Sequence, residues 1–515
     1  MKPIFGTVLG LKRSQWVYYG ALVVLAFFAA YLVGQHFSKS SLHGDSGAFA
    51  GVAQHLLHGK ILYKEVWDQK PPGIYFLFAF FEWIGHGNSQ TFHFIQMFFV
   101  FILVFFLLQF YNQCYKKVGW YFVFTIPLFL FSFMHWGYYY TGFYTEEYGS
   151  YFLLFAILLL QMNKPSCRMY FLAGILSGIS FLIKEPFLFL IFGFVFYILF
   201  TAELKIKSTF VFILGSALPV LLILIYLLAN DAWGDYVKYL SFSVHYSAIQ
   251  DEVKPGFWAG LKLFFIEWEK NVPLLRLLFW VGIGSLLDWK NNKKRWHFGA
   301  FYFALFILSA LIPTLGKVQY AHYFIPMAIF GALFSIQGMF WFANRIVAIL
   351  DPFIRKRYLI RLWMPLFLIF AVAVYGQESY AFLWKGKFPQ PVAESSERNS
   401  LLNATHGKQS LYVDMEYFGY YYWQSGLIGS LPFPSPYAGF FDGTGGESAG
   451  YENRKRFKEA FLKSPPQIII SRKNFSAAIV STDLLNYTSQ NYQLKDSFLN
   501  CMAEMSYVWS FKTAR

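Results

Sequence analysis

The chain has 515 residues, of which 57% are hydrophobic and only 14% are charged. A soluble globular chain carries roughly 25% charged residues, so this composition excludes an ordinary soluble domain. The formal net charge is +15, but the basic residues lie in short segments between apolar runs and form no basic face interleaved with aromatic side chains, so we predict no nucleic-acid partner.

Apolar runs divide most of the chain into membrane spans. A helix that crosses a bilayer needs roughly 20 apolar residues, and about eleven stretches approach this length. We therefore predict a mainly α-helical, polytopic protein surrounded by membrane lipids. The predicted spans cover approximately residues 17–34, 91–112, 119–136, 148–162, 169–183, 187–202, 209–229, 272–287, 298–313, 323–343 and 362–376.

Lysine and arginine gather in alternate segments between these spans, which indicates that those segments face the cytoplasm. The segments between them are longer and more acidic. An odd number of spans then places the chain after about residue 377 outside. The inner basic residues are Lys2, Lys12, Arg13, Lys116, Lys117, Lys164, Arg168, Lys205, Lys207, Lys290, Lys293, Lys294, Arg295, Arg345, Arg355, Lys356, Arg357 and Arg361.

Two outer segments are too long to be simple turns. Residues 35–90 contain a predicted helix from Asp45, a candidate N-cap, to Gly59, a candidate C-cap. The apolar stripe of this helix predicts that it lies flat on the membrane. A second helix is predicted at about 73–86. The other long segment, 230–271, is rich in Trp and Tyr, which predicts an interfacial position.

The last part of the chain is polar and carries loop signals. Residues 410–413 and 467–471 indicate buried strands, and 451–463 indicates a helix. We expect a transmembrane domain over 1–380 and a small extracytoplasmic α/β domain over 381–515.

The first long outer segment holds residues suited to group transfer. A carboxylate at Asp45 can accept a proton from an acceptor hydroxyl or orient it; a helix cap is the alternative. Lys70 precedes Pro71-Pro72, which favour a helix starting directly after them. Its ammonium and the free N–H groups of that helix predict a phosphate site; an interfacial lysine behind a rigid turn is the alternative. Asp68 is a candidate contact for a sugar or an acceptor.

Tyrosines and acids precede the fourth span. Tyr140, Tyr144, Glu146 and Glu147 are candidates for binding a sugar or acceptor by ring stacking and hydrogen bonding. The alternative is that the two acids complement the dipole of the following helix, within a belt of tyrosines.

Two later outer loops also carry charges. Lys184 and Glu185 lie between two short spans, where charges are costly and usually functional. They are candidates for binding a sugar or an acceptor; a pair that neutralises itself is the alternative. Lys317 and His322 precede the tenth span and are candidates for binding a phosphate. The alternative for His322 is an ordinary interfacial side chain.

The sequence specifies no cofactor. His55 and His58 are spaced i,i+3, but no third ligand is fixed, so no metal site is predicted. A divalent metal stays open as a cofactor. The chain has no P-loop, which argues against an ATP-driven pump.

The first outer segment resembles the first outer loop of GT-C glycosyltransferases. Asp45 is followed by an amphipathic helix ending at Gly59, then by Tyr63 and Lys70-Pro71-Pro72-Gly73. The likeness is greatest to the bacterial branch related to protein O-mannosyltransferases and lipid A aminoarabinose transferases, and it covers about residues 1–380. Other similar segments are Thr145-Glu146, Gly174 to Lys184, His322 to Pro326 and, more loosely, Pro465 to Ile469.

This resemblance implies a GT-C type helical bundle and an inverting transfer from a polyprenyl-phosphate sugar donor. It implies that Asp45 is catalytic, that Lys70 holds the carrier phosphate, and that Glu146 or its neighbour Glu147 is a second functional acid. Gly73 stands where many members have a bulkier apolar residue, which leaves these implied roles in place.

We therefore expect a glycosyltransferase of the cytoplasmic membrane that acts on its outer face, with a glycan, lipid or protein as acceptor. A transporter or flippase of lipid-linked saccharides is the alternative. It predicts inverted repeats, and none is found. A polysaccharide ligase or polymerase predicts arginines in a large outer loop, and neither long outer loop contains one.

Overall fold

The computed structural model describes most of the chain, and the predicted spans at 119–136 and 362–376 lie outside the described part. Tyr140 and Lys317 lie outside it as well. The described residues are 19–20, 22–27, 30–31, 44–86, 89–114, 143–162, 165–249, 257–271, 273–287, 293–315, 321–350, 394–414, 420–425, 427–429, 431, 447–473, 482–499 and 505–512.

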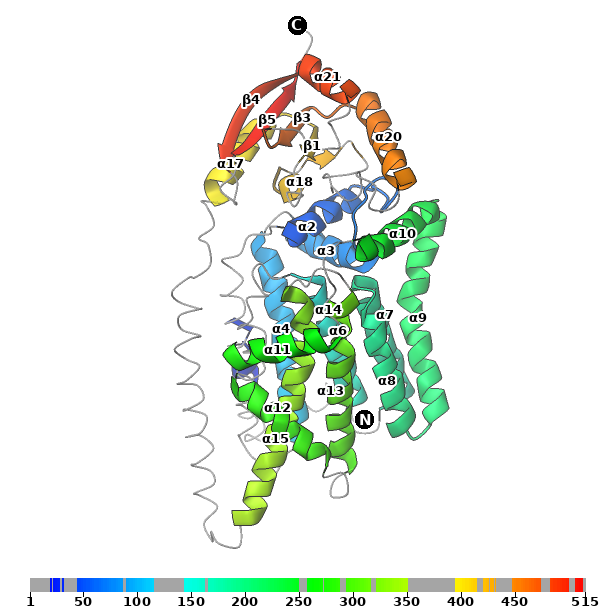
Figure 1. Ribbon diagram of the computed structural model, residues 1–515, viewed down its shortest axis with the longest axis vertical. Helices are drawn as coiled ribbons and strands as arrows, with labels where there is room; N and C mark the ends of the chain where they lie inside the picture. The colour runs from blue at the N-terminus through cyan, green and yellow to red at the C-terminus, as the bar shows by residue number, and fades with distance from the viewer. Residues whose placement is uncertain are drawn as a thin grey trace.

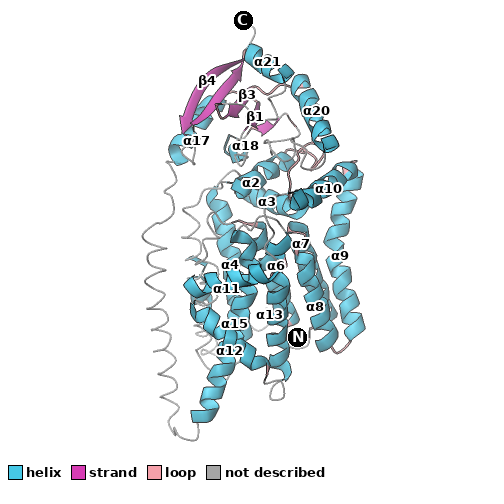
Figure 2. Cartoon of the chain, viewed as in Figure 1, coloured by secondary structure: helices cyan, strands magenta, loops and turns pink. Residues whose placement is uncertain are grey.

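The described elements form three layers along the long axis of the molecule (Figure 1). A bundle of apolar helices occupies one end, and a mixed sheet with its helices occupies the other. Between them, α2 (Gly44–Leu57), α3 (Pro72–Gly85) and α10 (Trp233–Ile249) lie across the top of the bundle. Figure 2 shows that the described strands all belong to the C-terminal layer.

The bundle has the composition of a membrane domain. Within the described residues, four helical segments are long and apolar enough to cross a bilayer, namely Gln90–Leu107, Lys205–Ala229, Trp296–Thr314 and His322–Phe342, and each overlaps a predicted span. The elements of the bundle are α4 (Ser89–Cys114), α6 (Thr145–Leu160), α7 (Cys167–Ile183), α8 (Phe187–Thr201), α9 (Lys205–Ala229), α11 (Phe257–Asn271), α12 (Pro273–Leu286), α13 (Lys293–Ser309), α14 (Ile312–Leu315), the 3₁₀ helix η3 (Ala321–Phe324) and α15 (Ile325–Leu350).

The outermost helix of the bundle, α9, is apolar on every side. Its Phe210, Leu222 and Ile225 are about 60% exposed, whereas Phe212 and Leu227 are buried against the bundle. A helix that is hydrophobic all round is stable only when it is buried in protein or in lipid. This exposed apolar face is the one that a bilayer covers.

Helices α7 and α9 touch backbone to backbone through glycines. A Cβ on Gly174 would lie 2.1 Å from the carbonyl oxygen of Phe212, and one on Gly178 would lie 2.2 Å from that of Ser216. Small residues four apart let membrane helices approach in this way. The contact fixes the course of α7, and Lys184 follows directly after its last residue.

A second close contact places α3 against the end of α7. Helix α3 begins at Pro72 behind the extended Pro71, as the double proline predicts. Gly73, in its first turn, has no side chain, and a Cβ there would lie 2.6 Å from the carbonyl carbon of Leu182. The absence of a side chain at Gly73 therefore brings the segment before α3 close to the segment after α7.

The structure changes two expectations for α2. The helix begins at Gly44, so Asp45 lies in its first turn and is not the N-cap. Phe49, Val52 and Ala53 are at most 1% exposed, because α2 packs on α3 and on α18 of the C-terminal layer. These residues of the apolar stripe therefore meet protein and do not lie on lipid, whereas Leu57 at the end of the helix is 45% exposed. Gly59 has φ +82°, which fits its predicted place at the end of the helix.

The C-terminal layer is built on a five-stranded sheet in the order β2-β1-β3-β5-β4. The first three strands in this order are parallel to one another, and β5 runs antiparallel to both of its neighbours, β3 and β4. The predicted strands correspond to β1 and β3, and the predicted helix lies within α20. The elements are α17 (Glu394–Thr405), β1 (Ser410–Asp414), α18 (Tyr420–Ser425), β2 (Ile428–Gly429), α20 (Glu447–Lys463), β3 (Ile468–Ser471), α21 (Thr482–Asn491), β4 (Tyr492–Leu499) and β5 (Met505–Phe511).

Both faces of this sheet are covered, because successive side chains of a strand point to opposite faces. Leu411 of β1 packs in a cluster with residues of α17 and α18. Tyr412, the next residue, packs with Phe457 and Phe461 of α20 and belongs to the core that continues into the helical bundle. The sheet layer is thus packed onto the layer below it.

His55 of α2 links that helix directly to the sheet. Its Nδ1 donates to the carbonyl oxygen of Gly51 at 2.7 Å, and its Nε2 accepts from the N–H of Gly429 in β2 at 2.7 Å. The ring also lies edge-on to Tyr422. Burial lowers the pKa of His55 to about 4, so the neutral ring makes both bonds at neutral pH.

Candidate active site

An ion pair joins the first turn of α2 to the segment before α3. Lys70 Nζ lies 3.3 Å from Asp45 Oδ2, and both side chains are mostly buried. The sequence placed both residues in the same long segment, 25 positions apart in number, and the crossing of α2 and α3 brings them into contact. Asp45 thus forms an ion pair from within the first turn of α2. It is not the N-cap of this helix, so the helix-cap alternative is wrong.

Two tyrosines hold the backbone of Lys70. The Tyr63 hydroxyl donates to the Lys70 carbonyl oxygen at 2.8 Å, and the Lys70 N–H donates to the Tyr75 hydroxyl at 2.9 Å. Because both backbone groups are bonded, the starting point of the side chain is fixed. The ammonium then reaches Asp45 from a position beside the N-terminus of α3.

A second charge cluster lies at the entry to α6. Glu146 Oε1 accepts a hydrogen bond from Lys184 Nζ and lies 3.9 Å from Nε2 of His322. Its other oxygen accepts from the Thr145 hydroxyl at 2.8 Å. The Glu146 side chain is 1% exposed, so its charge is met by these partners and not by water.

Aromatic rings flank this second cluster. The ring of His322 stacks on Tyr144, with centroids 4.5 Å apart and planes within 5° of parallel. The ammonium of Lys184 lies over the ring of Tyr323, 4.2 Å from its centroid. A cation over an aromatic face is attracted by the ring quadrupole. These rings limit where Lys184 and His322 can go.

The two clusters act on each other electrostatically. Burial raises the pKa of Asp45, but the charges of Lys70 and then His322 outweigh burial and lower this pKa below its ordinary value. Burial lowers the pKa of Lys70, but Asp45 outweighs burial and raises it. Both groups are therefore charged at neutral pH. Burial raises the pKa of Asp68 to about 6, although its carboxylate accepts from the Gln69 N–H at 2.6 Å.

Comparison with solved structures finds the same arrangement of elements in ArnT from Cupriavidus metallidurans. The apo crystal structure matches with a TM-score of 0.53 at 12% sequence identity, over 95% of this chain and 97% of ArnT. The structure bound to undecaprenyl phosphate matches with a TM-score of 0.55 at 11% identity, over 97% and 98% of the two chains. No protein-family profile matches the sequence, and no curated protein does.

The chain has the same fold as ArnT, which is the kind of helical bundle that the resemblance to GT-C glycosyltransferases implied. It is a multi-pass membrane protein like ArnT, with a small mixed sheet at its C-terminal end. The resemblance drawn from the first outer segment is confirmed at the level of the fold. The predicted boundary between domains at about residue 380 lies outside the described residues and stays a prediction.

Within this fold, the two adjacent acids of α6 have different surroundings. Glu146 belongs to the cluster with Lys184 and His322. Glu147 is bound inside the protein, where it accepts from Gln96 at 2.6 Å, from the Tyr151 hydroxyl at 2.7 Å and from the Phe143 N–H at 3.0 Å. The geometry therefore favours Glu146 as the second functional acid, and a sugar contact at Glu147 is not supported.

The charged pair after α7, Lys184 and Glu185, does not neutralise itself. Lys184 pairs with Glu146, whereas Glu185 accepts a hydrogen bond from the Tyr239 hydroxyl of α10. Sequence reasoning did not identify the roles of Tyr239 and Tyr75, because each is one of many tyrosines and its contact joins distant segments. Within the described residues, no group of three His, Cys, Asp or Glu side chains is placed to hold a metal ion.

Proposed function

We propose that this protein transfers a sugar from a polyprenyl-phosphate-linked donor to an acceptor hydroxyl, with inversion at the anomeric carbon. The observation that carries the proposal is the contact of Lys70 with Asp45 at 3.3 Å, beside a second cluster in which Lys184 and His322 surround Glu146. A base and the ammonium groups of Lys70 and Lys184 thus meet at one end of the bundle. The GT-C fold and the undecaprenyl phosphate bound to ArnT support the choice of donor.

The cations are suited to the departing phosphate. In the reaction the acceptor oxygen bonds to the anomeric carbon, and the bond from that carbon to the phosphate oxygen breaks. The electron pair stays on the phosphate, which gains negative charge. Lys70, assisted by Lys184, stabilises that charge more in the transition state than in the ground state, and this difference accelerates the reaction. His322 can assist them as a neutral hydrogen-bond donor to the phosphate.

Asp45 is suited to take the proton that the acceptor hydroxyl loses. While Lys70 is paired with it, its pKa is low and it is a weak base. A phosphate that draws the Lys70 ammonium away lets the pKa of Asp45 rise, because the charge that lowered it has moved. Donor binding then prepares the base. Asp68, with a pKa of about 6 and in the same loop, is a candidate for orienting the acceptor or the sugar.

The acceptor is a glycolipid, a polysaccharide or a protein on the extracytoplasmic face of the cytoplasmic membrane. The distribution of lysine and arginine supports this side for the cluster. The C-terminal sheet layer lies over α2, so the same orientation places it outside the membrane.

The test is the Asp45→Asn variant, reconstituted in proteoliposomes with a polyprenyl-phosphate donor carrying a labelled sugar and with an envelope extract as acceptor. We expect transfer to be lost while expression and thermal stability are kept. Asp483→Asn, which changes an exposed acid of α21, is the matched control. Mass spectrometry of envelope glycolipids and glycoproteins, with and without the protein, identifies the product.

Full activity of Asp45→Asn would refute the assigned role. Labelled carrier that crosses the vesicle membrane without any covalent transfer would instead support the transporter or flippase alternative and overturn the proposal.

A further inference from the structure

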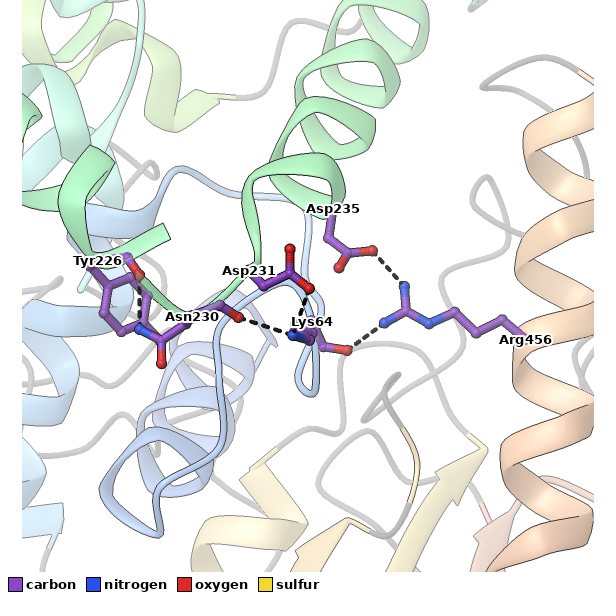
Figure 3. A network of polar contacts seen from close by, with 6 residues as sticks. All are labelled: Lys64, Tyr226, Asn230, Asp231, Asp235 and Arg456. Carbon is purple, nitrogen blue, oxygen red and sulfur yellow. Dashed lines mark hydrogen bonds and ion pairs between the residues drawn. The ribbon is translucent and has the colours of Figure 1, made fainter. Parts of the chain in front are cut away.

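Arg456 of α20 joins the C-terminal layer to two segments of the layer beneath it. Its Nη1 donates to Asp235 Oδ1 of α10 at 3.0 Å, and its Nη2 donates to the carbonyl oxygen of Lys64. Figure 3 shows the guanidinium lying between these two acceptors. A planar guanidinium can serve two acceptors at once, which a lysine ammonium on a flexible stem does poorly.

The turn that contains Lys64 is also held by helix α9 and by the junction of α9 and α10. The Lys64 ammonium donates to the carbonyl oxygen of Asn230 at 3.0 Å and to Asp231 at 3.3 Å, at the junction of α9 and α10 (Figure 3). The N–H of Leu62 donates to the Tyr226 hydroxyl of α9 at 3.0 Å. Helices from two layers therefore hold this turn on opposite sides.

The residue before Lys64 connects the turn to the candidate active site. Tyr63 has φ +66°, in the left-handed region that a tyrosine seldom adopts, so the turn must be held by its surroundings. Its hydroxyl donates to the carbonyl oxygen of Lys70. Its ring stacks on Tyr239, with centroids 4.9 Å apart, and the Tyr239 hydroxyl donates to Glu185.

Tyr63 is therefore linked to the segments of both active-site lysines. It bonds Lys70 directly, and it reaches Lys184 through Tyr239 and Glu185, the residue next to Lys184 in the chain. A shift of the turn that contains Lys64 moves Tyr63 and therefore changes its contacts toward both lysines. The carbonyl that Arg456 binds is one residue from the start of each path.

We propose that Arg456 is a positioning residue through which the C-terminal layer sets the places of Lys70 and Lys184. This inference rests on the proposed function, because it assigns to Arg456 an effect on the binding of a carrier phosphate. The C-terminal layer then contributes to the site without contacting the donor.

The experiment measures two quantities for Arg456→Ala, Arg456→Lys and a control in nanodiscs. The first is the affinity for undecaprenyl phosphate, and the second is the hydrogen exchange of amides 61–71 by mass spectrometry. The control is Lys458→Ala, which removes one positive charge from the same helix but breaks only the ion pair with Asp483 of α21.

We expect Arg456→Ala to weaken binding about 10-fold and to speed exchange in 61–71, because a displacement of about 1 Å caused at a distance can cost up to about 100-fold. Arg456→Lys keeps the charge but serves one acceptor, and we expect an intermediate result. Lys458→Ala should change neither quantity, and equal melting temperatures for the two Ala variants would show that global unfolding is not the cause.

A double-mutant cycle tests whether Arg456 acts through Lys70. In the Lys70→Met background, Arg456→Ala should weaken binding much less than it does in the wild type, because the group it positions has been removed. Additive losses would overturn the inference, as would unchanged exchange in 61–71. Failure of the wild-type protein to bind undecaprenyl phosphate would instead overturn the proposed function itself. Binding that Lys70→Met abolishes and Arg456→Ala leaves intact would overturn this inference alone.

Discussion

A single methyl group at Gly73 should separate the two lysine-bearing segments. In Gly73→Ala the new Cβ would lie 2.6 Å from the carbonyl carbon of Leu182, 2.7 Å from its oxygen and 2.9 Å from the nitrogen of Ile183. Non-bonded carbon atoms prefer about 3.5–4.0 Å. These neighbours are backbone atoms and cannot rotate away. The first turn of α3 must therefore move away from the end of α7 by about 1 Å.

Stability and activity should respond differently to this movement. Overpacking costs about 1–3 kcal/mol, and the higher helix propensity of alanine returns at most about 1 kcal/mol. The net loss of stability is therefore about 3 kcal/mol at most, and the protein should fold. Activity should fall about 100-fold, because Lys70 and Lys184 lie beside the displaced backbone and a misplacement of about 1 Å has that effect on positioned groups.

The assay is the rate of sugar transfer in proteoliposomes, with thermal unfolding of the same preparation. Gly284→Ala is the matched control, because a Cβ there would lie 3.6 Å from its nearest neighbour, an ordinary contact. We expect the control to keep its rate. A Gly73→Ala protein as active and as stable as the wild type would show that the two segments do not need this close contact, and the reasoning would be wrong.

Three further predictions follow from the charged groups. In Lys70→Met, the acidic limb of the residual pH–rate profile should move to higher pH, because the ammonium that lowers the pKa of Asp45 has been removed. An unmoved limb would show that Lys70 does not set the pKa of the catalytic base. Glu146→Gln should lower the rate of transfer at least 10-fold. Glu147→Ala should mainly lower the melting temperature, since it leaves buried donors unpaired at a cost of about 1–3 kcal/mol each. The reverse result in transfer and unfolding assays would make Glu147 the functional acid and Glu146 the structural one. The pKa of His55 in the folded protein is about 4, below its ordinary value of 6.5. Its contribution to stability is therefore complete above pH 6.5 and is lost as the pH falls toward 4. Hydrogen exchange in β2 should rise over this pH range in the wild type and stay constant in His55→Gln.

The sequence allowed the bundle and the start of α3 to be predicted, and it singled out Asp45 and Lys70 in one loop, for physical reasons that are local. Apolar length indicates spans, and the double proline before Gly73 indicates where α3 starts. The pair of Asp45 and Lys70 follows from one loop that folds back on itself. Such features depend on residues that are close in the chain, so a pattern of side chains is enough to reveal them.

The remaining contacts depend on how distant elements pack, and no local pattern contains them. Lys184 and Glu146 are 38 positions apart, and Arg456 and Lys64 are 392 positions apart. The apolar stripe of α2 suits lipid and protein equally, and only the packing of α18 over it decides between them. For the same reason the sequence did not separate Glu146 from Glu147.

The scattered origin of the charge cluster has a consequence for biosynthesis. Asp45, Glu146, Lys184 and His322 enter the membrane in that order as the ribosome proceeds, and Glu146 meets His322 only after 176 further residues have been made. A partly inserted chain therefore exposes isolated charges with no complete site. Translation that stops before η3 should leave a fragment without His322, so premature products lack part of the cluster.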